Sequence, residues 1–220
     1  MNVSVSILDC DFLHLEDELK AVVQAGADAI HLDVMDGHFV PNLSFGVPLA
    51  RAVRKCVTIP VRAHLMVLEP EWLVEKFLPY ADRIIFHVEA TELAEQCLET
   101  IRAGGKSAGV SLNPGTSIER IEPFIGQIDE VLVMSVHPGL GGQQFIPESL
   151  ERIRRIRTLL DRQAGNHGHV RPAVSVDGGV NSSNCRAVAA AGATTLVAGS
   201  AVFRSPDYAA AIRELKCSDS

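Results

Sequence analysis

The chain has 220 residues, of which 47% are hydrophobic and 21% charged, a composition typical of a folded globular protein rather than a disordered or fibrous one. Its 20 Lys and Arg residues against 27 Asp and Glu residues give a formal net charge of -7. Proteins that bind nucleic acid or an anionic membrane usually carry a basic excess. We therefore expect neither nucleic acid nor a membrane as a partner.

The cysteines and the first residues bear on the compartment. The 5 cysteines are odd in number, widely spaced and without a CxxC pair, so neither a disulfide framework nor a zinc–thiolate site is expected. The N-terminal segment lacks the basic region and the apolar run of a signal peptide. These features predict a cytoplasmic protein.

Short runs rich in Val and Ile alternate along the chain with amphipathic stretches of helix length. Helices are predicted over residues 11–25 and 148–160, where apolar residues recur on one face, and a polar loop over 163–171. The apolar runs predict strands that begin near Val3, Ala29, Val61, Arg83, Ser107, Glu130, Ala173 and Thr195.

An Ala-Gly phrase precedes three of these strands, at Gly26, Gly104 and Gly192, where glycine is typical of a left-handed helix cap. The phrase indicates repeated strand–helix units, and no linker or composition break divides the chain. We predict one α/β domain over residues 1–220, a (β/α)8 TIM barrel, with an open doubly wound sheet as the alternative.

Polar residues stand at the carboxyl ends of three predicted strands. His31 and Asp33 share one face of their strand, His64 ends the next, and Asp177 ends the seventh. Buried charges need partners or metals, and imidazole with carboxylate suits a divalent first-row ion such as Zn, Fe, Mn or Co. The alternative is a set of hydrogen-bonded polar residues at a barrel rim.

Three methionines, Met35, Met66 and Met134, stand at or near the same strand ends. Methionine commonly fills irregular gaps in a core, which is the simpler interpretation. The alternative is a soft lining that keeps water away from a charged intermediate.

Glycines follow the last three predicted strands, where many such barrels bind phosphate through backbone N–H groups. Plain turn glycines are the alternative. None of the lysines falls at a strand end, which argues against a Schiff-base mechanism. We expect the anion to be held by backbone N–H groups, with Ser200 and the start of a short helix from Ala201 adding to them. Valine at Gly179 would then raise KM far more than it changes the fold.

Five segments are long enough to be recognised: 31–42 (HLDVMDGHFVPN), 64–67 (HLMV), 134–143 (MSVHPGLGGQ), 176–179 (VDGG) and 198–201 (AGSA). Together they resemble the motifs of the ribulose-phosphate 3-epimerase family, and the likeness runs from about Val3 to Phe203. The resemblance implies a TIM barrel of the ribulose-phosphate-binding type. It also implies a cytoplasmic isomerase of carbohydrate metabolism, in the pentose phosphate pathway.

Such an enzyme interconverts D-ribulose 5-phosphate and D-xylulose 5-phosphate by two-base proton transfer at C3, through an enediolate. By the same resemblance, the cofactor is one divalent metal ion per subunit, the substrate is a phosphorylated keto-pentose, and the protein is expected to be a homo-oligomer.

The resemblance also assigns roles to residues. It implies that His31, Asp33, His64 and Asp177 bind the metal and that Asp33 and Asp177 transfer the protons. The residues that it implies for substrate binding are Ser6, His64, Gly139, Leu140, Gly141, Gly142, Asp177, Gly178, Gly179, Gly199 and Ser200.

The first strand departs from the family pattern. Ser4 and Val5 stand where Ala and Pro are usual, and Asp9 stands where Ser or Asn is usual. The departures concern the surroundings of Ser6 and leave the metal residues untouched.

Three other functions stay open. One is a 3-epimerase of a six-carbon keto-sugar phosphate such as D-allulose 6-phosphate, although the runs 134–136 and 178–180 favour the pentulose enzyme. Another is a metal-dependent lyase or phosphate-ester hydrolase. The third is a non-catalytic sugar-phosphate sensor, and the presence of both Asp33 and Asp177 speaks against it.

Overall fold

Eight parallel strands close into a barrel in the computed structural model, which describes residues 1–167 and 171–216. Each strand is hydrogen-bonded to the next in sequence order, and β8 returns to β1. This closure confirms the predicted TIM barrel and excludes the open sheet. The strands are β1 Asn2–Ser6, β2 Ala29–Met35, β3 Val61–Met66, β4 Arg83–His87, β5 Ser107–Leu112, β6 Glu130–Met134, β7 Ala173–Asp177 and β8 Thr195–Ala198.

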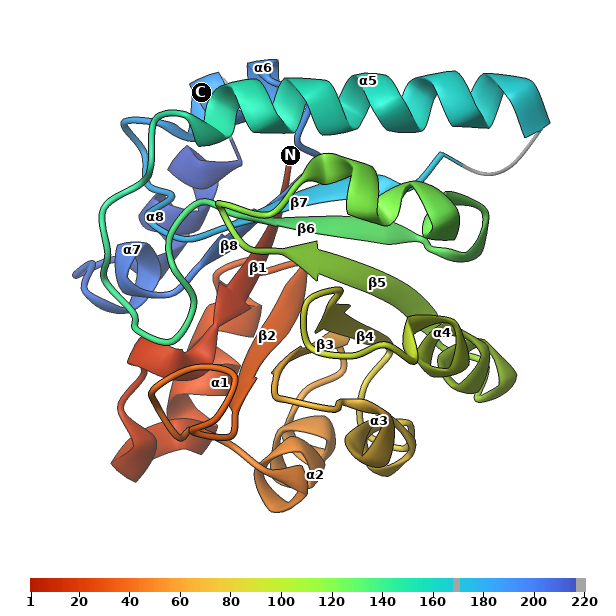
Figure 1. The fold of residues 1–220 in the computed structure, drawn as a ribbon. Helices are drawn as coiled ribbons and strands as arrows, with labels where there is room; N and C mark the ends of the chain where they lie inside the picture. Colours follow the sequence, from red (N-terminus) through yellow and green to blue (C-terminus); the bar gives the residue numbers. More distant parts are fainter. Residues whose placement is uncertain (168–170, 217–220) are drawn as a thin grey trace.

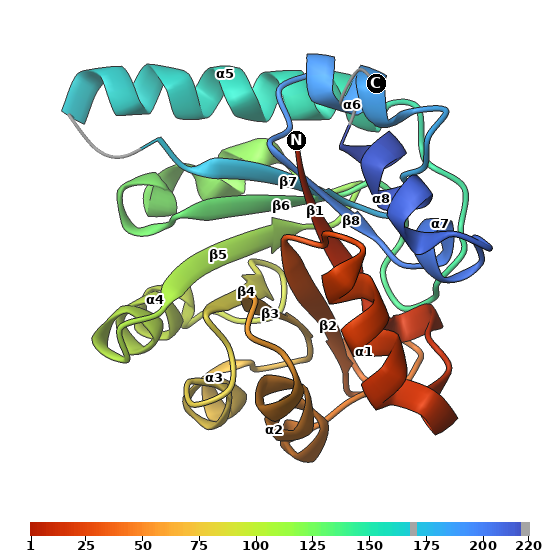
Figure 2. The same ribbon diagram turned by 180° about the vertical axis from the view of Figure 1, so that it is seen from behind.

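Helices surround the barrel on its outside (Figures 1 and 2). The longest helix, α5, lies across β6 and β7, while α3 and α4 cover the side formed by β3, β4 and β5 (Figure 1). The helices are α1 Leu15–Gln24, α2 Val47–Cys56, α3 Glu71–Phe77, α4 Ala94–Ala103, η3 Ile118–Gln127, α5 Ser149–His167, α6 Cys185–Ala190, α7 Ser200–Phe203 and α8 Tyr208–Leu215.

Two predicted segments differ in detail from the structure. The helix predicted over 11–25 begins as a 3-10 turn, Phe12–His14, whose first turn is capped by the side chain of Asp11, before α1 starts. The prediction of a loop over 163–171 is wrong for residues 163–167, because α5 continues to His167. A helix gains one hydrogen bond with each residue added, so a polar segment can extend it. Residues 168–170 of that loop lie outside the described residues.

The helix-cap glycines confirm the repeated unit. Gly26 and Gly192 have φ angles of 93° and 110°, and in the third copy the left-handed residue is Gly105, with φ 70°. Only glycine adopts this conformation without a steric penalty. The caps therefore turn each preceding helix toward the strand that follows it.

Two separate apolar layers result from the alternation of side chains along the strands. Ile30, Leu32 and Val34 of β2 belong to the large core between the strands and the helices. Ile85, Leu132 and three other apolar side chains form a smaller cluster inside the barrel. His31 and Asp33, which alternate with these residues on β2, consequently point inward, as the sequence pattern predicts.

A buried ion-pair network fills the amino end of the barrel interior. The carboxylate of Glu130, which is fully buried, contacts the guanidinium groups of Arg62 and Arg83 and the hydroxyl of Ser175. Arg62 also donates to Ser175 Oγ at 3.0 Å. Burial alone would raise the pKa of Glu130, but the charges of Arg62 and Arg83 hold it below its ordinary value.

We expect Glu130→Ala to lower the free energy of unfolding by about 3–5 kcal/mol, because it leaves the Arg62 charge buried and uncompensated. Urea unfolding measures the loss. The control is Glu151→Ala, which breaks an exposed pair with Arg154. Pairs of that kind are worth about 0.2–1 kcal/mol, so equal losses in the two variants would contradict a stabilising role for the buried network.

The same network predicts how the stability difference between wild type and Glu130→Ala depends on pH. The ionised form of Glu130 is favoured in the folded state, so its contribution is complete above its ordinary pKa of 4.5. It is lost as the pH falls through the lower pKa of the folded state. The stability gap between wild type and Glu130→Ala should therefore narrow in acid.

Among the described residues, no helix is long and apolar enough to cross a membrane. That residues 1–220 form one domain stays a prediction.

Candidate metal centre and active site

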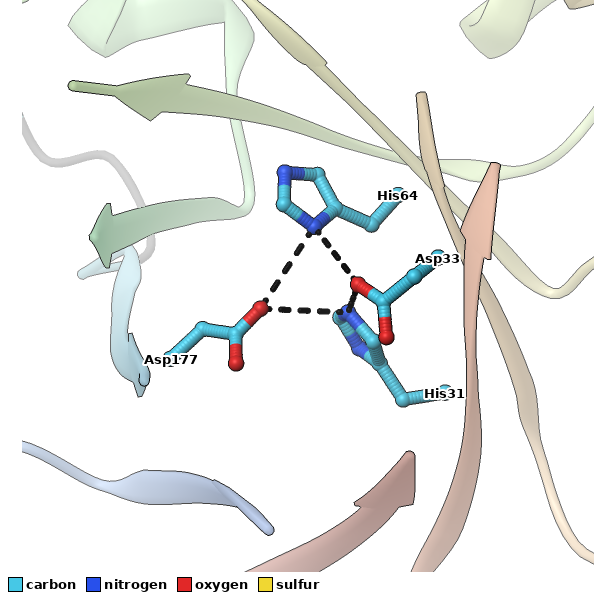
Figure 3. Close-up of side chains that lie close together, drawn as sticks. All are labelled: His31, Asp33, His64 and Asp177. Atoms are coloured by element: carbon cyan, nitrogen blue, oxygen red, sulfur yellow. Dashed lines mark hydrogen bonds and ion pairs between the residues drawn. The ribbon is translucent and has the colours of Figure 1, made fainter. Parts of the chain in front are cut away.

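Four polar side chains meet inside the carboxyl end of the barrel (Figure 3). His31 and Asp33 come from β2, His64 from β3 and Asp177 from the last position of β7. One ligand atom from each lies within 4.8 Å of all the others. The structure thus brings together all four residues that the sequence placed at one mouth.

Strand register accounts for the convergence. Asp33 of β2 is paired with His64 of β3, and paired residues of parallel strands project from the same face at the same height. Asp177 is paired with Met134 of β6, which faces the same interior. His31 lies two residues before Asp33, one step deeper in the barrel.

The two carboxylates lie on opposite sides of the cluster, and each faces both imidazoles (Figure 3). Asp33 Oδ1 is 3.2 Å from His64 Nδ1 and 3.3 Å from His31 Nε2. Asp177 Oδ2 is 3.5 and 3.7 Å from the same two nitrogens. The other oxygen of Asp33 accepts a hydrogen bond from Ser6 Oγ at 2.5 Å. Ser6, which the family resemblance places on the substrate, therefore also fixes the rotation of Asp33.

The cluster fits a cation. Within the part of the chain that the structure describes, both ring nitrogens of His31 are buried and make no hydrogen bond, although two carboxylates are near. A buried ring nitrogen without a hydrogen bond costs free energy, and metal coordination by Nε2 would satisfy that atom. Two imidazoles with two carboxylates form a donor set that divalent first-row metals accept.

The pKa values show the same preference for positive charge. Burial disfavours protonated His64, but hydrogen bonds and charges from Asp177 and Asp33 outweigh it and raise the pKa of His64 to about 9. Burial would also raise the pKa of Asp33, yet the two imidazoles hold it well below its ordinary value. The site thus stabilises a positive charge between its carboxylates.

His87, which lies outside the four-residue cluster, packs against the ring of His64. His87 ends β4, is fully buried, and its ring stacks on that of His64 with the centroids 5.0 Å apart. Its Nε2 is 2.9 Å from His64 Nε2, and its Nδ1 is 3.4 Å from the carboxylate of Glu89. Burial lowers the pKa of His87 to about 4 although Glu89 opposes the shift, so His87 is neutral and can accept a hydrogen bond.

These contacts fix the tautomer of His64. If Nδ1 of His64 offers its lone pair to a metal, Nε2 must carry the proton and donate it to His87. His87 then carries its own proton on Nδ1, which faces Glu89. The arrangement His64–His87–Glu89 therefore orients one ligand of the candidate metal site.

We expect His87→Phe to weaken metal binding by about 10–100-fold, the usual cost of losing such a partner. Phenylalanine keeps the stacked ring and removes both ring nitrogens, the acceptor for His64 and the Nδ1–H that faces Glu89. Titration calorimetry of Zn²⁺ into the metal-free protein measures the change. His14→Phe, which removes an exposed imidazole at the N-cap of α1, is the control. Equal metal affinity in wild type and His87→Phe would contradict the orienting role.

A pocket opens above the cluster at the carboxyl ends of the strands. The buried methionines Met35, Met66 and Met134 line it, as the interpretation of a soft, water-excluding lining requires. His31 and His64 are fully buried and are not among the residues that line it. The other predicted site residues in the wall are Ser6, Asp33, Gly139, Leu140, Gly141, Gly142, Asp177, Gly178, Gly179, Gly199 and Ser200.

The position of Gly179 corrects one expectation. Its φ is 64°, and a Cβ there would stand 2.3 Å from the backbone nitrogen of Phe145 and 2.8 Å from the carbonyl oxygen of Gln143. Valine would displace the loop between β6 and α5. The expectation that Gly179→Val spares the fold is therefore wrong, since a rigid backbone occupies the space.

Sequence reasoning missed one residue that holds the site together. Ser135 follows β6, and its Oγ donates to the carbonyl oxygens of Asp177 and Gly178 at 2.9 and 2.6 Å. Its backbone N–H donates to Asp177 O at 2.8 Å. Ser135 thus fixes the backbone from which Asp177 projects. A buried serine within an apolar strand end is the signal that was available.

It also missed an ion pair at the glycine-rich end of the pocket. Arg204 follows α7, and its Nη2 is 3.0 Å from Asp9 Oδ1. The sequence showed only that Asp9 is unusual at its position.

A sequence model of the ribulose-phosphate 3 epimerase family matches residues 2–203. The chain belongs to this family. A ribulose-phosphate 3-epimerase from Synechocystis sp. is 46% identical over 213 residues, covering 96% of this chain and 90% of the relative. The protein of that name from Escherichia coli is 39% identical over 216 residues, covering 97% and 94%.

Solved structures of more distant proteins share the barrel. A 3-hexulose-6-phosphate synthase superposes with a TM-score of 0.72 at 21% identity and covers 99% of both chains. A mutant tryptophan synthase α-subunit from Pyrococcus furiosus gives 0.70 at 16% identity, covering 98% of this chain and 97% of that one. At these identities the likeness concerns the fold alone.

Proposed function

We propose that the protein is an isomerase that interconverts D-ribulose 5-phosphate and D-xylulose 5-phosphate. The observation that carries the proposal is the pair of carboxylates on opposite sides of one metal-binding cluster, in a chain of this family (Figure 3). Inversion at a carbon beside a ketone requires a proton to leave one face and another to arrive at the opposite face. Two acid–base groups that flank the reacting carbon meet that requirement.

Asp33 and Asp177 take the two roles. In one direction Asp33 accepts the C3 proton, and Asp177 donates a proton to the other face; in the reverse direction the roles exchange. Asp33 is ionised, since its pKa is held below its ordinary value, so it has a free oxygen to accept a proton, and Ser6 fixes its orientation. Asp177 reaches the pocket from β7, on the other side of the cluster from Asp33, on a backbone that Ser135 holds.

The proposed metal site consists of His31, Asp33, His64 and Asp177. A Zn, Fe, Mn or Co ion bound there would supply positive charge that stabilises the oxygens of the enediolate, an effect worth several kcal/mol. Met35, Met66 and Met134 add no exchangeable protons and exclude water from the reacting carbon.

Backbone N–H groups of the loops after β6, β7 and β8 are proposed to hold the phosphate. The supporting observation is the run of pocket-lining glycines in these loops, which leave the backbone open to a bound group. The substrate contacts proposed for Ser6, His64, Leu140 and Ser200 rest on the family resemblance and, except for His64, on their place in the pocket wall.

Gly199→Ala is expected to raise KM for the phosphorylated sugar about tenfold, the loss of roughly one hydrogen bond to a charged group. Gly199 has an ordinary φ of -105°, and its Cβ would meet Ser6 O at 3.1 Å, so the backbone tolerates alanine better than at Gly179. Steady-state kinetics measures the change. Gly115→Ala is the control, because its Cβ would meet nothing within 4 Å. A change in kcat with KM constant would contradict the phosphate role.

Proton NMR of D-ribulose 5-phosphate in D2O, with the protein and a divalent metal, tests the function. We expect D-xylulose 5-phosphate to appear as the C3 proton signal is replaced by deuterium. A parallel reaction with D-allulose 6-phosphate tests the six-carbon alternative, which the comparisons do not favour. Faster turnover of the hexulose, or release of inorganic phosphate, would contradict the proposal.

Two broader proposals accompany the reaction. A cytoplasmic location is supported by the free thiols of Cys10, Cys56 and Cys97. A homo-oligomer is supported by the exposed apolar side chains of Leu13 and Leu43, which are 91% and 73% accessible. Sedimentation of the purified protein tests the oligomer.

A further inference from the structure

The charged residues that line the pocket are all acidic. Among the described residues of its wall these are Asp9, Asp33 and Asp177. A phosphorylated sugar is itself an anion, so each of these carboxylates opposes its binding unless a cation offsets it. Asp33 and Asp177 belong to the candidate metal cluster, which supplies that cation. Asp9 lies outside this cluster, so its charge must be offset by a different cation.

Arg204 is placed to be the cation for Asp9. Its guanidinium Nη2 is 3.0 Å from Asp9 Oδ1, although the two residues are 195 positions apart in sequence. Arg204 is the C-cap residue that follows α7, and its backbone N–H donates to Ser200 O. The pair therefore joins the segment after β1 to the segment after β8.

Three glycines of the proposed phosphate end make room for this pair. A Cβ at Gly141 would lie 2.8 Å from Asp9 Oδ2, and one at Gly199 would lie 3.2 Å from the same atom. A Cβ at Gly142 would lie 3.1 Å from Arg204 Nη2. The carboxylate and its counter-ion thus touch the backbone segments that are proposed to bind the phosphate.

We propose that Arg204 acts as the counter-ion of Asp9 and thereby sets the affinity of the pocket for the phosphate group. This inference rests on the proposed function, since it takes a phosphate as the group bound between these loops. Asp9 is 17% exposed at the pocket wall, whereas Arg204 is 68% exposed. A salt bridge with one partner this exposed adds little stability. Its two charges nevertheless act on an anion that binds nearby.

Opposite single substitutions and their combination test the inference. Arg204→Gln leaves Asp9 unpaired and should raise KM for D-ribulose 5-phosphate about tenfold, roughly what one unit charge a few ångströms away supplies. Asp9→Asn removes the repulsive charge and should lower KM. The double variant Asp9→Asn/Arg204→Gln carries neither charge and should return KM close to that of wild type.

Inorganic phosphate, as a competitive inhibitor of the metal-loaded enzyme, should show inhibition constants in the same order as the KM values. The difference between Arg204→Gln and wild type should shrink as the salt concentration rises, because ions screen exposed charges. Lys20→Gln and Glu16→Gln are matched controls, since they make the same changes of net charge in an exposed pair on α1. These controls should leave KM unchanged.

An unchanged KM in Arg204→Gln would overturn the inference. So would a double variant as impaired as Arg204→Gln, because Arg204 would then bind the phosphate directly instead of neutralising Asp9. Failure of the proposed function is distinguishable, since wild type would not epimerise the sugar at all. In that case calorimetric titration with inorganic phosphate still compares the four proteins.

Discussion

Replacement of Asp177 by Asn is expected to slow epimerisation at least about 10²-fold, the lower end of what a positioned acid or base contributes. Asparagine has almost the same shape and keeps an oxygen toward the cluster, but it neither takes nor gives the proton. Asp33→Asn should cost as much, because each carboxylate serves one face of the substrate. Steady-state turnover of both epimers measures the two losses.

Deuterium exchange separates the two roles. In Asp177→Asn, Asp33 can still remove the C3 proton from one epimer and return deuterium to the same face. That epimer should gain deuterium without inversion, and Asp33→Asn should label the other epimer instead. Exchange on the same epimer in both variants would contradict the assignment of the carboxylates to opposite faces.

Because both residues also belong to the candidate metal site, each variant needs its metal content measured. Turnover is compared per bound ion, determined by elemental analysis. Asp17→Asn, a change of the same charge on the exposed side of α1, is the control. Near-wild-type turnover in either site variant with its metal bound would exclude the two-base mechanism.

The sequence predicted those parts of the site that depend on local pattern. Alternation along β2 places His31 and Asp33 on one face, and the end of a parallel strand always lies at the same mouth of a barrel. Both rules act within a few residues. The convergence of these two residues with His64 and Asp177 could therefore be expected once eight strands had been identified.

The contacts that sequence could not predict join residues far apart in the chain. Glu130 meets Arg62 across 68 positions, and Asp9 meets Arg204 across 195. Which residues meet across the interior depends on the closure and stagger of all the strands, which no single segment determines. The need for glycine at position 179 is of the same kind, because it arises from the backbone of the loop at Phe145.

Chelation of the metal is expected to abolish epimerisation while the barrel stays folded. The large apolar core between strands and helices contains none of the four cluster residues, so the fold has its own source of stability. Without the ion, protonated His64, whose pKa is raised to about 9, offsets part of the charge of the two carboxylates. Far-ultraviolet circular dichroism at 25 °C should therefore change little, whereas activity disappears.

The ion binds the folded protein, so its removal should still lower the melting temperature, by an amount that depends on its concentration relative to Kd. Activity should return when Zn²⁺, Mn²⁺, Co²⁺ or Fe²⁺ is added back, and the order of recovery ranks the candidate metals. A chelator already saturated with Zn²⁺, which has no capacity left for the ion of the protein, serves as the control for direct inhibition. Full activity in protein shown by elemental analysis to be metal-free would contradict a metal-dependent reaction. Negatively charged carboxylates cannot stabilise the negative oxygens of the enediolate, so that result would require another source of positive charge. Loss of the far-ultraviolet signal on chelation would instead assign the ion a structural role, in which the cluster closes the barrel rather than serving its chemistry.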